Sequence, residues 1–201
     1  MECPSMTSRR WGSVATSLVD SLTGASLVGM GNNFTVDNTP TVETSGTFAS
    51  NGAMKANPYA SQLAAHGVPE TMWPMLAAHG VGTLVEKLGI KFLEITRDRV
   101  VATMPVEGNG QVAGILHGGA SVALAETLGS FAAAVHGAGA KKPVGVDISA
   151  THHRAGVSGL VTGVCTPIHL GRTLTTHEIV ISDESGRRVC TSRITNMLLE
   201  G

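Results

Sequence analysis

The stretch GQVAGILHGGASVALAETLGSFAAAVHG, residues 110–137, decides the fold, because it is the most apolar helical segment of the chain and holds one charged side chain, Glu126. The apolar run begins directly after a glycine pair and predicts a helix over about 117–136. A helix that is apolar on nearly every side has to be covered on nearly every side. We therefore expect a central helix whose circumference is almost entirely buried by one face of a sheet.

The segments before this helix predict two short helices and a strand pair. Residues 57–67 and 69–80 each end in Ala-Ala-His-Gly, and a glycine in that position commonly ends a helix. Residues 90–96 and 99–106 alternate in polarity around a charged turn, which is typical of paired strands. We expect the two helices to fold over the core, and residues 107–116 to form a glycine-rich loop.

Four strand-like segments follow the helix, at 143–153, 158–170, 174–183 and 187–199. Their connections are short and turn-forming, so we expect adjacent strands to be antiparallel. A central helix wrapped by an antiparallel β-sheet is an α+β fold. The predicted domain covers residues 57–201.

Residues 1–56 differ from the rest of the chain in composition. They are rich in Ser, Thr, Gly and Asn and show no sustained helical or strand period, which predicts a flexible or disordered N-terminal tail. Two alternatives stay open. The segment is a targeting leader, although its acidic residues are unusual for one, or translation starts at Met54.

Charge and cysteine content narrow the function classes. The 14 basic and 15 acidic residues nearly cancel, which argues against nucleic acid or an anionic lipid surface as a partner. Cys3, Cys165 and Cys190 lack the pairing of a disulfide framework or a zinc cage, so we expect a reducing, cytoplasmic setting. No apolar run reaches the roughly 18 residues of a membrane span.

The His-Gly dipeptide occurs four times, and only His117-Gly118 opens an apolar helix. Glycines at a helix start expose backbone N–H groups at the positive end of the helix dipole. Such groups stabilise an anion or a developing oxyanion. The His117-Gly118-Gly119 start therefore predicts a site for a polarised carbonyl.

Glu126 is the second candidate for chemistry, with Thr127 beside it and Ser130 one turn on. An isolated carboxylate in apolar surroundings is costly unless it is paired, hydrogen-bonded or protonated. Two interpretations stay open: Glu126 faces outward or makes a structural hydrogen bond, or it takes part in a reaction.

The spacing of these two features has a geometric consequence. Gly118 and Glu126 are eight residues apart, or about 12 Å along a helix, so one chain cannot bring both to the same carbonyl. Two antiparallel helices related by a twofold axis could place the start of one beside the middle of the other. The spacing therefore predicts a homodimer with two shared sites.

Several spaced motifs resemble the hotdog-fold acyl-CoA thioesterases. Within them, the chain is similar to the branch with a glutamate in the central helix, which includes the Arthrobacter-type 4-hydroxybenzoyl-CoA thioesterases, the 1,4-dihydroxy-2-naphthoyl-CoA hydrolases and the proofreading thioesterases of enterobactin synthesis. The match covers roughly residues 79–199. It is carried by Gln111, the 117–119 start, Glu126, Thr127, Ser130, and the segments THHR at 151–154 and GVCTPIHLGR at 163–172.

The resemblance implies a role for each matching position. Glu126 would be the nucleophile or general base on the thioester carbonyl, and the Gly118 N–H would donate to the oxyanion. Gln111 and His117 would support the carbonyl and the loop. Ser130 would position water or orient the glutamate, and Thr127 and His152 would line the substrate pocket. The family also implies a homotetramer built as a dimer of dimers. Neither a metal nor another cofactor is expected, because a thioester has a good leaving group.

The substrate is expected to be an acyl-CoA, with an aryl group first, a medium-chain group second and a carrier-protein thioester third. Its phosphates need local cations or N–H donors, and solvated surface charge is the alternative for each candidate. The candidates are Arg154, Gly171, Arg172 and Thr173, followed by Lys141 and Lys142. The relatives often carry Gln-Pro-Phe-Gly where this chain has Gln-Val-Ala-Gly at 111–114. An aromatic acyl group is therefore not assured.

Two other function classes remain open. A hotdog hydratase or dehydratase is one, because a fold does not fix the reaction. A non-catalytic acyl-CoA-binding or regulatory module is the other, and it would tolerate loss of Glu126. A metal site at His152 and His153 is not expected, since adjacent strand residues point to opposite faces of a sheet.

Overall fold

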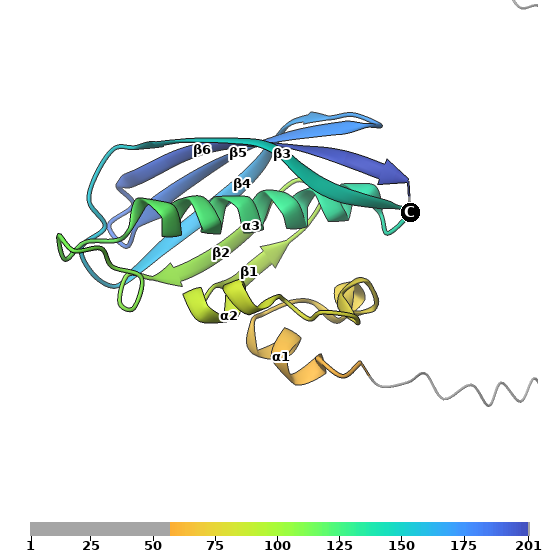
Figure 1. Ribbon diagram of the computed structural model, residues 1–201, viewed down its shortest axis with the longest axis horizontal. Helices are drawn as coiled ribbons and strands as arrows, with labels where there is room; N and C mark the ends of the chain where they lie inside the picture. The colour runs from red at the N-terminus through yellow and green to blue at the C-terminus, as the bar shows by residue number, and fades with distance from the viewer. Residues whose placement is uncertain (1–56, 201) are drawn as a thin grey trace, which may run out of the picture. The chain divides into compact units, whose positions relative to one another are not determined.

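The computed structural model describes residues 57–200 of the 201-residue chain. The expected N-terminal tail at 1–56, the possible leader and the possible start at Met54 lie outside the described residues. The domain within 57–200 consists of one long helix, three shorter helical segments and one sheet (Figure 1).

The sheet has six strands in the order β1-β2-β4-β5-β6-β3, and all neighbours are antiparallel. The long helix α3, Gly118–Gly137, lies across one face of it (Figure 1). This confirms the expected α+β architecture with a central helix. The strands are β1 Lys91–Ile95, β2 Val100–Pro105, β3 Lys141–His152, β4 Leu160–Leu170, β5 Leu174–Asp183 and β6 Arg188–Glu200.

One expected strand pairing is wrong. β3 does not pair with β4, the next strand in the chain, but with β6, and it forms an edge of the sheet. The connection at 153–159 crosses the end of the sheet. At its start, the N–H groups of His153 and Arg154 both donate to the Val189 carbonyl. At its end, the Gly159 carbonyl accepts from Val106, which delivers the chain to β4 beside β2.

Close contact between α3 and the sheet depends on two glycines. A Cβ atom on Gly129 would overlap Ile194 of β6, and a Cβ atom on Gly163 of β4 would overlap Leu128 of the helix. Side chains of α3 with no solvent exposure, such as Leu124, fill the space between these points. The core therefore lies between one side of α3 and the inner face of the sheet.

The other side of α3 is not covered within one chain. Glu126 and Gly119 are exposed, and Ala123, Ser130 and Ala134 are only half-buried. The expectation that the sheet buries nearly the whole helix circumference is therefore wrong for a single chain, because the sheet packs against one side only. Except for Glu126, this outward side carries small residues.

The free edge of β3 adjoins this uncovered region. β3 pairs only with β6 and leaves its other edge without a partner among the described strands. Most of its residues are exposed, including Val144 and Val146. Because an unpaired strand edge readily pairs with another chain, this edge is suited to contact a second molecule.

The three short helical segments pack against the core, as expected for the first two of them. α1, Ala60–Ala65, contributes Leu63, and the 3₁₀ helix η1, Glu70–Leu76, contributes Met72. Pro74 inside η1 cannot donate a backbone hydrogen bond, which opposes a regular α-helix there. The helix α2, Thr83–Leu88, was not expected from the sequence and ends at Gly89 in a left-handed conformation.

Within residues 57–200, α3 has the length and apolar composition of a membrane-crossing helix. Length and composition alone are weak evidence, because the core helix of a domain passes the same test. Here one side of α3 packs against the sheet.

Candidate functional site

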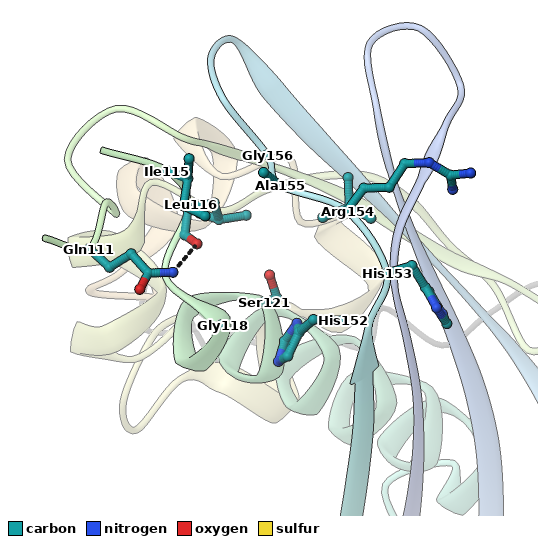
Figure 2. A pocket seen from close by; sticks show the side chains of 11 residues that line it. Gln111, Ile115, Leu116, Gly118, Ser121, His152, His153, Arg154, Ala155 and Gly156 are labelled. Carbon is teal, nitrogen blue, oxygen red and sulfur yellow. Dashed lines mark hydrogen bonds between the residues drawn. The ribbon is translucent and has the colours of Figure 1, made fainter. Parts of the chain in front are cut away.

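A cavity of about 330 Å³ lies at the N-terminal end of α3 (Figure 2). The cavity is lined by the loop before the helix, the first turn of the helix, the end of β3 with the crossing connection that follows it, and Val189 of β6. Four of the residues predicted from the sequence are among the lining residues, namely Gln111, Gly118, His152 and Arg154. The start of the helix and the THHR segment therefore do meet in space.

The helix start leaves one backbone donor available in this cavity. The His117 side chain caps the helix, with its Nδ1 accepting from the Gly119 N–H at 2.8 Å. The His117 carbonyl accepts from Ala120 and Ser121. The Gly118 N–H has no hydrogen-bond acceptor among residues 57–200. It sits at the positive end of a helix dipole and is suited to bind an anionic oxygen.

The His152 ring packs directly on Gly118. A Cβ atom on Gly118 would lie 2.9 Å from His152 Nε2, so any side chain at position 118 would displace the ring. Figure 2 shows the His152 ring beside the helix start, whereas the ring of His153, which also lines the cavity, extends toward Thr191. The His153 Nε2 is 2.9 Å from the Thr191 hydroxyl. Within the described part of the chain, no group of three or more His, Cys, Asp or Glu side chains could hold a metal.

Gln111 is held by the loop that it belongs to. Its side-chain Nε2 donates to the Leu116 carbonyl at 3.3 Å (Figure 2), and its backbone N–H donates to Ile115 at 2.8 Å. The loop is tied to the crossing connection by a bond from the Leu116 N–H to the Gly156 carbonyl. The Gln111 side chain is thereby fixed at the wall of the cavity.

Arg154 lines the cavity but directs its charge outward. Its guanidinium donates to the Arg188 carbonyl at 3.1 Å, and Figure 2 shows the side chain extending away from the cavity. The side chain is exposed. It is therefore placed to meet a group outside the cavity mouth.

The other predicted residues lie elsewhere in the chain. Glu126, Thr127 and Ser130 do not line this cavity, and Glu126 is exposed on the outward side of α3. A helix spacing of eight residues puts Glu126 about 12 Å from Gly118. One chain therefore does not bring the carboxylate and the free N–H together.

The turn made of Gly171, Arg172 and Thr173 lies at the opposite end of the helix. His136, in the last turn of α3, is 3.0 Å from the Gly171 carbonyl, and Lys141 donates to the Arg172 carbonyl at 2.7 Å. A separation of about 27 Å between the two helix ends follows from the rise per residue. This turn therefore does not belong to the Gly118 cavity of its own chain.

A second cavity, of about 340 Å³, lies beside the C-terminal half of α3. Ser130 lines it, and Glu126 is one turn earlier on the same side of the helix. The remaining walls are mostly apolar and come from η1, from α3, from the turn after α3 and from the start of β3. They are Met72, Met75, Leu76, Phe131, Ala134, Gly139, Lys141, Lys142 and Pro143.

Buried titratable groups in the core are held in their neutral form. Burial raises the pKa of Cys165 to about 12 and also raises the pKa of Cys190. Both thiols are therefore poor nucleophiles, as expected for buried small side chains. Burial, and after it the nearby His136, lowers the pKa of His177 to about 4.

Sequence reasoning missed Ser121 and the wall formed by residues 155–156, together with the other lining residues Ile115, Leu116, His153 and Val189. Ser121 lies one turn beyond Gly118 and could have been found from helix periodicity. The wall at 155–156 carries no chemical signal in the sequence. Its position depends on β3 pairing with β6, which the short connection did not indicate.

Comparison with known proteins places these features in a family. The family model described as the thioesterase superfamily matches residues 113–190. The proofreading thioesterase EntH of Cronobacter turicensis is 53% identical over 125 residues, which cover 62% of this chain and 91% of that protein.

Solved structures show the same fold. The thioesterase HI1161 from Haemophilus influenzae matches with a TM-score of 0.57 at 41% identity, over 63% of this chain and 87% of that one. A Staphylococcus aureus protein, SAV0944, matches with a TM-score of 0.57 at 30% identity, over 59% of this chain and 99% of that one. Two structures of SAV0944 carry alanine in place of a glutamate and of a glutamine.

Proposed function

This chain belongs to the thioesterase superfamily as a hotdog-fold thioesterase that hydrolyses thioesters, and from that premise we propose that two subunits share each reaction centre. In this proposal, Glu126 of one subunit acts on the thioester carbonyl as nucleophile or general base. The Gly118 N–H of the other subunit stabilises the oxyanion. The observation that carries the proposal is a Gly118 N–H without an acceptor among residues 57–200, in a cavity to which these residues contribute no carboxylate.

The exposed side of α3 supports a dimer. Ala123, Ser130 and Ala134 are small and would let two antiparallel helices approach closely, with Glu126 between them. The free edge of β3, with exposed Val144 and Val146, runs alongside and offers backbone groups for a second chain. In one twofold dimer, the outward side of α3 and the free edge of β3 would both contact the second subunit.

In this dimer, the other predicted site residues can bind the substrate or orient the reacting groups. Gln111 and His152 line the cavity around the Gly118 N–H and would hold the carbonyl and the sulfur of the substrate. His117 keeps the helix start in shape through its bond to Gly119. Ser130 and Thr127 of the subunit that supplies Glu126 would orient water and the carboxylate. A thiolate leaves readily, so a carboxylate and an oxyanion donor suffice for the chemistry.

The positions of Gln111 and Glu126 in the sequence support the roles proposed for them. In SAV0944, the glutamine and the glutamate that were replaced by alanine are fifteen residues apart. Gln111 and Glu126 have the same separation. The shared spacing supports Gln111 and Glu126 as the counterparts of the two positions that were replaced in SAV0944.

The substrate in this proposal is an aryl- or medium-chain acyl-CoA. Arg154 at the cavity mouth of one subunit, and Gly171, Arg172 and Thr173 of the other, would bind its phosphates. Antiparallel helices would bring that turn toward the partner's cavity, because it lies at the C-terminal end of α3. The buried free thiols Cys165 and Cys190 support a reducing, cytoplasmic location.

A second interface is part of the proposal, giving a dimer of dimers. Exposed apolar side chains of three strands form a row on the outer face of the sheet, where Val144 pairs with Met197 and Met197 pairs with Leu174. An exposed apolar row is suited to bury itself against an equal surface.

A mixing experiment tests the shared site. Glu126→Gln and Gly118→Val are each expected to abolish hydrolysis, the first by removing the acid and the second by displacing His152. If the two variants are refolded together, each mixed dimer contains one site with both native groups. Activity should return to about one quarter of the wild-type value at equal mixing.

Differently tagged subunits verify that mixed dimers form, and Gln111→Ala in place of Gly118→Val provides a milder second pairing. Mixed dimers without activity would overturn the shared site. A fully active monomer in sedimentation would do so as well.

A further inference from the structure

The cavity beside Ser130 is the natural place for the acyl group, provided that the proposed function holds. Glu126, Ser130 and Ala134 follow at helical spacing on the outward side of α3. An acyl group attached to a carbonyl at Glu126 therefore meets this cavity about 6 Å further along the helix. The walls of this cavity then determine which acyl groups are accepted.

Most of the wall is apolar and adaptable. Phe131 packs against Phe92 in a tilted arrangement, with ring centroids 4.4 Å apart. Met72 and Met75 come from η1, and their flexible thioether side chains fit acyl groups of different shapes. This part of the wall favours an acyl group with an apolar middle portion. It does not determine which chemical group stands at the end of the acyl chain away from the thioester.

The same cavity has two lysines among its lining residues. Lys141 and Lys142 line it, and none of its lining residues is Asp or Glu. Lys141 is engaged, donating to the Arg172 carbonyl at 2.7 Å and pairing with Glu200 at 3.2 Å. The ammonium of Lys142 makes neither a hydrogen bond nor an ion pair with other groups of residues 57–200.

We propose that this thioesterase prefers acyl groups with an anionic far end, and that Lys142 binds that end at the rim of the apolar cavity. The substrate class is a thioester of a dicarboxylic acid, with an aliphatic or an aromatic body between the two carboxyl groups. The apolar wall takes the body of the acyl group. The ammonium takes the second carboxylate, which would otherwise be costly to bring against apolar side chains.

Matched substrates test this preference. The value of kcat/KM is measured for adipoyl-CoA against hexanoyl-CoA, and for 4-carboxybenzoyl-CoA against 4-methylbenzoyl-CoA. The wild type should favour the carboxylate in at least one pair. Lys142→Gln should lower that ratio about fivefold, the upper range for a solvent-accessible ion pair. Lys142→Glu should lower it further, and added salt should weaken the wild-type preference.

Lys87→Gln is the matched control, because Lys87 lies on α2 outside this cavity and its loss should leave the ratio unchanged. A wild type without preference in either pair would overturn the proposal. Equal losses for both members of a pair with Lys142→Gln would also overturn it, because Lys142 would then bind the CoA portion that all these substrates share. Either outcome leaves the role of Glu126 intact, since that role is tested by loss of all hydrolysis.

Discussion

The two sides of α3 differ in how completely residues of the same chain bury them. On the inner side, Leu124 and Leu128 have no exposed surface, and Gly129 brings the helix against Ile194. On the outer side, Glu126 is exposed among small residues. The inner side stabilises the fold, whereas the outer side bears the proposed chemistry. Substitutions on the two sides should therefore separate stability from catalysis.

The largest expected effect comes from the outer side. Glu126→Gln should lower kcat about a thousandfold, because an amide neither attacks the thioester nor accepts a proton from water. The free energy of unfolding should change little by comparison, because glutamine has nearly the same size and shape as glutamate and leaves the buried inner side of α3 unchanged. Thiol release and denaturant unfolding of the same preparation measure both. Loss of stability in proportion to the loss of activity would contradict the separation.

The next effect concerns His177, on the sheet beneath the helix. Its side chain has no exposed surface, and neither ring nitrogen has a hydrogen-bond partner among residues 57–200. Burial and the nearby His136 lower its pKa from 6.5 to about 4. Between these pH values the unfolded chain takes up a proton that the native chain does not. Stability should therefore fall by about 3 kcal/mol as the pH drops from 6.5 to 4, with no contribution above this window.

His177→Leu isolates this contribution, because leucine does not titrate. Denaturant unfolding of both proteins at a series of pH values gives the difference between them. That difference should grow in favour of the variant as the pH falls. Parallel curves for the two proteins would show that His177 does not cause the decline.

The smallest effect is expected at the contact between helix and sheet. Alanine in place of Gly129 gains up to about 1 kcal/mol of helix propensity. Its Cβ atom overlaps Ile194, and such overpacking costs about 1–3 kcal/mol. We expect a net loss of about 1 kcal/mol in the free energy of unfolding, with kcat unchanged.

Ile194→Ala removes the overlapping methyl group and provides the control for this contact. The double variant should be more stable than the sum of the two single changes indicates, because the overlap is gone. Strict additivity in denaturant unfolding would show that the two positions do not press on each other.

Periodicity predicted the individual elements better than their neighbours. The helix expected at about 117–136 is Gly118–Gly137, and the strand expected at 174–183 is Leu174–Asp183. The pairing of β3 with β6 was not predictable from local pattern, since the short segment 154–157 resembles a hairpin turn. Hydrogen bonds from residues 153 and 154 to Val189 redirect it. α2 was missed because six residues are too few for a clear helical period.

The parts of the candidate site that depend on residues close together in the sequence were predictable. His117 and Gly118 open a helix, and that local fact indicated an oxyanion site that the free Gly118 N–H supports. The spacing between Gly118 and Glu126 also indicated that one chain cannot bring them together. The wall at 155–156 and the cavity beside Ser130 were not predictable, because both depend on segments that meet only in the folded chain.

The position of β6 has a consequence for the order in which the protein folds. β6 is the last strand of the described chain to leave the ribosome, yet it lies between β5 and β3 and pairs with both along most of its length. Until it emerges, β3 has no neighbour, and α3 lacks part of the surface on which it packs. Pairings between strands so distant in sequence form slowly. Before β6 is in place, the apolar helix of the nascent chain is therefore incompletely covered. Exposed apolar surface of this kind is prone to aggregate and is what chaperones bind.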